Sequence, residues 1–215
     1  MSEPPAIYCG VDDMTDAEVR FAWVDELYED ILPTVALVGG AGVDEVIRRL
    51  GGLPASGRLM TVGQVVEFSE GNRGTGLVGV GGLGDLVFIV EDGCTTAVPG
   101  VLRDLSKGGR AFSVSVDVDG GDTMGYAVDG DLVVFGEHWG PVRPLRDNDP
   151  RWDPEWCRAL IDVADESEIW GVKIFALMER VMGSAVQPQW FTDPLRTVGV
   201  PAASGYAGTS AWDVP

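Results

Sequence analysis

The segment RAFSVSVDVDGGDTMGYAVDGDLVVF, from Arg110 to Phe135, decides the fold class of this chain. Apolar and polar side chains alternate from Phe112 to Asp119, with the two-residue period of a strand that has one buried face. Shorter apolar runs follow, separated by turns that contain glycine. The segment therefore predicts neighbouring antiparallel strands, with one face on the core and the other facing water or a partner.

The turn VDVDGGD, from Val116 to Asp122, raises the question of a cation site because it holds three carboxylates. An EF-hand loop starting at Asp117 would need an acid or amide at position 5, glycine at position 6 and glutamate at position 12. The sequence has glycine, aspartate and valine at these positions. We therefore expect a hairpin turn, which Asp129-Gly130 repeats one strand later, and keep a cation site as the alternative.

Similar strand patterns precede this segment, and helical periodicity flanks the strand region. The apolar runs predict further strands at 34–38, 62–68 and 86–91, and helical spacing predicts helices at about 15–32, 43–50, from 153 and at 167–182. We expect an α+β fold, in which an antiparallel β-sheet meander is covered on one face by N-terminal and C-terminal helices. The expected organisation is a flexible leader at 1–14, a single domain at 15–191 and an irregular tail at 192–215.

The charge limits the classes of partner. Thirty-four acidic residues against 15 basic ones give a net charge of −19. Such a chain repels phosphate backbones, which argues against direct nucleic-acid binding and favours a basic protein partner or mimicry of nucleic acid. A well-solvated surface is the plainer alternative. The start of the chain lacks signal-peptide features, and no apolar run approaches the roughly 18 residues of a membrane span, so we expect a cytoplasmic protein without membrane contact.

No motif for catalysis or cofactor binding stands out. The stretch from Gly79 to Gly84 matches GxGxxG, but it leads into a predicted strand instead of opening the helix that a dinucleotide site needs. His138 is the only histidine, and its neighbours do not resemble a nucleophile elbow. Cys94 lies beside acids that would raise the pKa of a thiol, and the three cysteines are too far apart for a zinc motif. We therefore expect no catalytic residues, no metal and no cofactor.

The outward face of the predicted sheet is the candidate partner-binding surface. We expect it to carry polar side chains, with tryptophans nearby as anchors: Ser113, Ser115, Asp117, Asp119, Trp139, Trp152 and Trp156. Exposed aromatic residues beside arginine are typical of interface hot spots. The alternative is that most of the tryptophans fill the core.

A resemblance rests on the order of several segments: ALVGGAGVDEVIRRLGG (36–52), the strands up to Phe135, ALMERVMG (176–183) and QPQWF (187–191). Over residues 34–191 this order resembles an uncharacterised actinobacterial and actinophage domain family. Its pattern runs from an apolar strand and a short basic-ended helix, through a meander, to a helix and a "TPEWL"-type motif. The matching motifs are structural and carry no catalytic residues with them. The resemblance implies an actinobacterial or bacteriophage source and, by analogy, an antagonist or immunity-like role.

Three function classes follow from these observations. The leading hypothesis is a non-enzymatic, acidic module that binds a protein partner, with a basic protein as the favoured kind. The first alternative is a nucleic-acid mimic that inhibits a DNA-binding protein, which needs acids in rows at phosphate spacing. The second alternative is an enzyme of unrecognised type, which needs a pocket where polar groups converge.

Overall fold

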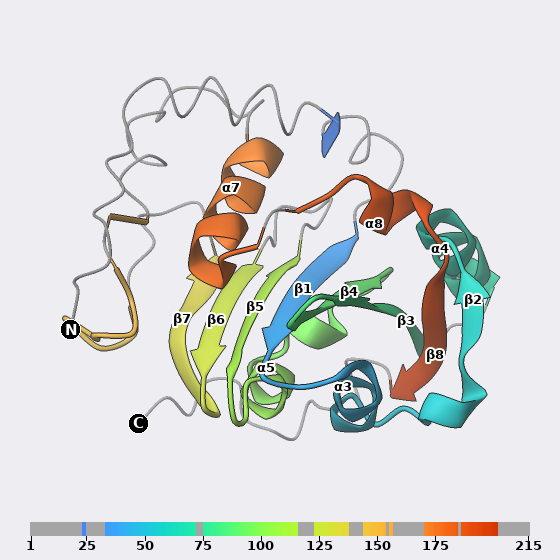
Figure 1. Ribbon diagram of the computed structural model, residues 1–215, viewed down its shortest axis with the longest axis horizontal. Helices are drawn as coiled ribbons and strands as arrows, with labels where there is room; N and C mark the ends of the chain where they lie inside the picture. Colours follow the sequence, from blue (N-terminus) through green and yellow to red (C-terminus); the bar gives the residue numbers. More distant parts are fainter. Residues whose placement is uncertain are drawn as a thin grey trace.

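A computed structural model describes residues 23–24, 33–71, 75–115, 123–137, 144–153, 155–156, 170–184 and 186–201. In these residues, eight strands form one antiparallel sheet in the order β2-β8-β3-β4-β1-β5-β6-β7 (Figure 1). The strands are β1 (Thr34–Gly39), β2 (Arg58–Met60), β3 (Thr75–Leu83), β4 (Leu86–Glu91), β5 (Arg110–Ser115), β6 (Thr123–Val128), β7 (Asp131–Glu137) and β8 (Leu195–Pro201). The helices are α3 (Val43–Arg49), α4 (Val62–Gly71), α5 (Pro99–Leu105), α7 (Trp170–Met182) and α8 (Gln189–Thr192), with short 3-10 helices η1 (Pro54–Ser56) and η2 (Thr95–Ala97). The α+β class and the antiparallel sheet are confirmed.

Strand β1 lies in the middle of the sheet and is buried along its whole length. It pairs with β4 on one side and with β5 on the other. Its sequence, TVALVG, is apolar at consecutive positions, which is typical of a strand that is covered on both faces. Both faces of the sheet centre must therefore be packed by other elements.

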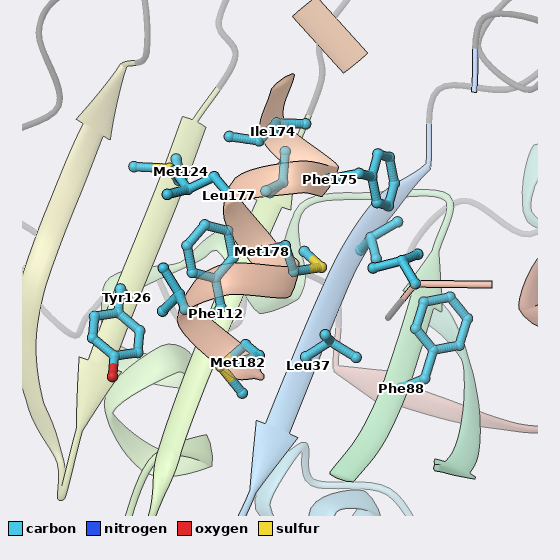
Figure 2. Packing of buried hydrophobic residues seen from close by; sticks show 14 of the residues in the cluster. Leu37, Phe88, Phe112, Met124, Tyr126, Ile174, Phe175, Leu177, Met178 and Met182 are labelled. Carbon is cyan, nitrogen blue, oxygen red and sulfur yellow. The ribbon is translucent and has the colours of Figure 1, made fainter. Parts of the chain in front are cut away.

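One face of the sheet is covered by α7, α8 and the start of α4. Figure 2 shows α7 lying across β1, β5 and β6, with Leu177, Met178 and Met182 close to Leu37 and Phe112 on the strands. These residues belong to one buried apolar cluster that also contains side chains of α8 and of α4. Helix α7 is apolar on most of its surface, as expected for a helix that is largely buried.

The opposite face is covered by α3 and α5. Ile47 and Leu50 of the α3 region and Leu102 and Leu105 of α5 form a second buried cluster with Ala36 and its neighbours on the strands. Figure 1 shows α3 and α5 along the lower part of the sheet, away from α7. The prediction of helices on one face only is therefore wrong. The burial of both faces of β1 requires two helical layers.

The meander is confirmed only in part. Strands β5, β6 and β7 are consecutive neighbours, and Asp129 (φ 51°) with Gly130 (φ 86°) forms the left-handed turn between β6 and β7. The order of the remaining strands is not sequential. Residues 195–201, which were expected in the irregular tail, form β8, and β8 pairs with β3 and β2 inside the sheet. The expected tail is wrong for this segment, because its pairing partners lie far away in the sequence.

Residues 62–68 were expected to form a strand and are instead part of α4. Thr61 and Gln64 form a reciprocal capping box: the amide of Thr61 donates to Gln64 Oε1 at 3.0 Å, and the amide of Gln64 donates to Thr61 Oγ1 at 3.4 Å. Val62 and Val65 are buried one helical turn apart. The valines favour a strand locally, but the cap and the burial of one helix face decide for a helix.

The expected helix at 43–50 is confirmed. Helix α3 has Asp44 and Glu45 in its first turn and two arginines in its last, and Gly51 follows it at φ 77°. The charges stabilise the helix dipole, and the positive φ suits a glycine stop. Among the described residues, none of the helices has the length and apolar character that crossing a bilayer requires.

The contrast between a buried and an exposed phenylalanine tests this packing. Phe88 is fully buried, with ring centroids 5.0 Å from Trp190 and 5.3 Å from Phe191, whereas Phe68 is 47% exposed. We expect Phe88→Ala to lower the free energy of unfolding by about 3–5 kcal/mol. The control Phe68→Ala should change it by only about 0.5 kcal/mol. Urea denaturation measures both, and equal losses would contradict the assignment of Phe88 to the core.

Candidate functional site

Ser113 and Ser115, which were expected on an exposed face of the sheet, are buried. Ser113 is 0% exposed and Ser115 7%. Strand β5 contacts η2 and α5, and these elements cover the face on which the serines were expected to meet water. Buried hydroxyls cannot contact a partner, so this part of the expected surface is wrong. Asp117, Asp119 and Trp139 lie outside the described residues.

The hydroxyl groups of this region join a buried network around Glu91 of β4. Glu91 Oε1 accepts hydrogen bonds from the amide of Thr96 at 2.6 Å and from its hydroxyl at 2.8 Å. Ser113 Oγ donates to Thr96 Oγ1 at 3.4 Å, and the hydroxyls of Thr34 and Ser115 lie 2.8 Å apart. The bonds of Glu91, Thr96 and Ser113 therefore connect β4 and β5 with η2, and the contact between Thr34 and Ser115 joins β1 to β5.

The carboxyl of Glu91 is 2% exposed and has a shifted pKa. Burial raises the pKa above the ordinary value of 4.5, because the charged form loses its hydration, while hydrogen bonds from Thr96 and Thr95 lower it in part. Buried groups with shifted pKa values are candidates for catalysis, but structural networks shift pKa values as well. Neither of the two hollows described below is lined by Glu91. We infer that the network mainly holds η2 onto the end of the sheet.

Cys94 precedes η2, and its thiol is exposed and not in a disulfide. Within the described part of the chain, no three His, Cys, Asp or Glu side chains gather in a way that could hold a metal ion. His138 and the aspartates of the 116–122 turn lie outside that part. Strands β5 and β6 are antiparallel neighbours, with Ser115 opposite Thr123, so this turn does join two adjacent strands. The hairpin expectation agrees with that pairing, and the cation alternative stays a prediction.

The two described tryptophans that were expected as anchors pack inward. Trp152 is 5% exposed and belongs to the core cluster, with its ring 6.0 Å from Tyr126 and 5.3 Å from Trp156. Trp156 is half-buried against the same cluster. The expectation that Trp152 is an exposed anchor is therefore wrong, because it fills space beside β6.

An ion-paired loop holds Trp152 in place. Arg151 Nη2 lies 2.7 Å from Asp149 Oδ2, and Arg151 Nη1 lies 3.3 Å from Asp131 Oδ2 on β7. The hydrogen bonds from Arg151 lower the pKa of Asp149 to about 2. The arginine beside Trp152 therefore fixes a loop onto the sheet edge.

The glycine-rich stretch 79–84 lies in β3 and in the turn after it. Gly82 and Gly84 line a hollow of about 470 Å³ together with Gly42 and Val43 at the start of α3 and with Asp85. No helix follows the glycines, as predicted, although most of them are strand residues and not loop residues. The carboxylate of Asp85 would repel a phosphate group, so the hollow does not fit a dinucleotide.

A second hollow lies at the β2 edge of the sheet. It has a volume of about 660 Å³, and residues of β2, α4, β3 and β8 line it, among them Arg58, Met60, Glu67, Phe68 and Thr197. Of the large apolar side chains that stand exposed among the described residues, Leu59 (74% exposed) and Phe68 (47%) line it, and Leu53 (71%) precedes η1 in the chain. We call the set Arg58, Leu59, Met60, Glu67 and Phe68 the β2–α4 surface.

The register of β2 orients this surface. Arg58 is opposite Thr197 of β8, Leu59 is opposite Arg196, and Met60 is opposite Leu195. Opposite residues share a face and successive residues alternate. Arg58 and Met60 therefore lie on the face that carries α4, and Leu59 lies on the other.

The glycine before β2 lies close against the side chain of Arg196 on β8. A Cβ at Gly57 would come within 2.5 Å of Arg196 Cγ, so any side chain there would displace this arginine. Arg196 Nη1 in turn lies 2.8 Å from Asp44 Oδ1 of α3. Gly57 thus allows β2 to lie close to β8. Strand β2 is the end strand of the described sheet.

The β2–α4 surface was not foreseen in the sequence, although one signal pointed to its helix. The pair Thr61 and Gln64 has the spacing of a capping box, which marks the start of a helix. The exposure of Phe68 had no such signal, because Phe68 is three residues after the buried Val65, a spacing that is typical of one helix face.

Comparison with known proteins gives no relative to reason from. No protein-family model, no curated protein and no solved structure matches this chain.

The buried carboxyl predicts a pH dependence of stability. The pKa of Glu91 in the folded protein is above its unfolded value, so its favourable contribution is complete below pH 4.5 and is lost as the pH rises through the folded pKa. Glu91→Gln keeps an oxygen that can accept from Thr96 and removes the titration. We expect the free energy of unfolding of the native chain, minus that of the variant, to fall as the pH rises from about 5 to 8.

Glu45→Gln is the control for this experiment. Hydrogen bonds from Arg49 and Arg48 lower the pKa of Glu45 below its unfolded value of 4.5, so the corresponding difference should stay flat between about pH 5 and 8 and fall only at lower pH. Urea titrations at several pH values measure both differences. A difference for Glu91→Gln that is independent of pH would contradict the shift.

Proposed function

We propose that this chain is a non-enzymatic, acidic interaction module that binds a protein partner through the β2–α4 surface. The observation that carries the proposal is that two exposed apolar side chains, Leu59 and Phe68, line one hollow at the β2 edge of the sheet. Single exposed apolar residues are normal on protein surfaces, but a group of them beside a groove is typical of an interaction site. Cytoplasmic localisation remains part of the proposal.

The layered fold supports an interaction at the edge. Helices cover both faces of the sheet around β1, whereas β2 has a paired neighbour only in β8 among the described strands. An end strand presents backbone amides and carbonyls that an added strand can pair with. A partner would gain backbone hydrogen bonds from β2 and apolar contacts from the side chains around it.

The net charge of −19 affects the rate at which a charged partner associates. Residues 12–30 carry eight acids and one arginine, and residues 162–168 carry four acids and no base. Such segments would speed the encounter with a basic protein and disfavour acidic competitors. An antagonist or immunity-like role, which the family resemblance implies, fits a module that acts by occupying a partner's surface.

The alternatives receive less support from the described residues. A nucleic-acid mimic needs rows of acids without intervening bases. Several described acids are instead paired with bases, as Glu45 is with Arg48 and Arg49 and as Asp104 is with Lys107. The enzyme alternative stays a prediction, for which the described part of the chain offers no candidate reacting group beyond Glu91 and Cys94.

Differential capture tests the proposed surface. We expect the doubly substituted chain Leu59→Glu/Phe68→Glu to lose partner proteins that the native chain captures from an actinobacterial lysate, with affinity for the purified partner reduced by about tenfold to a hundredfold. Lys107→Glu is the matched control, because it lowers the net charge by the same two units at a residue in the turn after α5, which does not line this surface. Equal capture by all three proteins would contradict the surface, and turnover of a substrate by the native chain would contradict the non-enzymatic role.

A further inference from the structure

We propose that the partner at the β2–α4 surface is a second copy of this chain, with the two β2 strands paired antiparallel about a twofold axis. The inference rests on the proposed function, because it uses the same surface and names what covers it. The resulting dimer would have one continuous sheet across the two copies. Three features of the surface carry the inference: the symmetry of β2, its mixed charge and its exposed central leucine.

The first feature is the symmetry of the short strand. Strand β2 has three residues, and Leu59 is the central one. A twofold axis at this residue places Leu59 of one copy directly against Leu59 of the other, and Arg58 against Met60. Side chains that are directly opposite in an antiparallel pair are in contact. The exposed leucines would therefore cover each other on one face, and Met60 would support the stem of Arg58 on the other.

The second feature is charge complementarity within one groove. Arg58 of β2 and Glu67 of α4 line the same hollow from its two sides. In a twofold contact each copy offers the same patch to the other. The guanidinium group of Arg58 therefore enters a groove where Glu67 of the second copy supplies a negative charge, and this pairing occurs twice. A basic partner would meet Arg58 in the groove, which makes it a poorer fit at this location.

The third feature is the exposed apolar residue at the centre of the edge. Leu59 is 74% exposed. Burial of this side chain against its copy would offset the protection that the short length of β2 and the charge of Arg58 give the edge.

The net charge gives the dimer a distinctive response to salt. Two copies of a chain with a charge of −19 repel each other, and salt screens this repulsion over a Debye length of about 10 Å at 0.1 M. Association of two copies should therefore strengthen as salt is added. Binding of a basic protein should weaken instead, because salt screens the attraction.

Sedimentation analysis of the full chain tests the inference. We expect a particle of twice 22.9 kDa whose dissociation constant decreases between about 0.05 and 0.5 M NaCl. The variants Arg58→Glu and Glu67→Arg should each weaken the dimer by about tenfold or more, and Leu59→Glu should do so as well. The double reversal Arg58→Glu/Glu67→Arg keeps the native net charge and should restore the dimer. Thermal unfolding of each variant checks that it is folded.

Several results would overturn the inference. They are a monomer at both salt concentrations, a dimer that weakens with salt, a dimer that none of the substitutions affects, and a double reversal that fails to restore association. If the chain is monomeric but captures another protein in a way that depends on Leu59 and Phe68, the inference fails and the proposed function stands. If neither self-association nor capture depends on these residues, both fail.

Discussion

The burial of β1 on both faces is the constraint on which the rest of this structure depends. The strand has no polar side to turn to water, so it needs a helical layer on each side and a paired strand along each edge. Helices α7 and α8 supply one layer, and α3 and α5 supply the other. The Glu91 network closes the end of the sheet at which the hydroxyls of Thr34 and Ser115 meet.

This constraint also decides where the molecule can act. Because both faces of the sheet centre are used for packing, side chains of β5 such as Ser113 serve the interior. The proposed contact with another protein therefore uses an edge of the sheet, and the described edge with exposed apolar side chains is β2 with α4. Leu59 and Phe68 are apolar side chains at this edge that the helices and strands of the described chain leave exposed.

The sequence predicted the features that depend on neighbouring residues. The alternation and turns of 110–135 predicted β5 to β7, and the glycine at position 51 predicted the end of α3. Prediction from the sequence failed where the structure depends on distant segments. Periodicity shows that Ser113 and Phe112 lie on opposite faces of β5, but it does not show which helices cover each face. Strand β8 was missed because Val198 is stabilised by pairing with Val78, about half the chain away. The β2–α4 surface was missed because exposure depends on what the other elements leave uncovered.

Amide hydrogen exchange at increasing protein concentration tests the central claim, which is that the covered sheet leaves the β2 edge as its place of contact. We expect amides of residues 58–60 to become protected as the chain associates, while those of β1 exchange slowly at every concentration. Protection that instead develops along residues 110–115 of β5, with no change in β2, would show that association does not use the β2 edge.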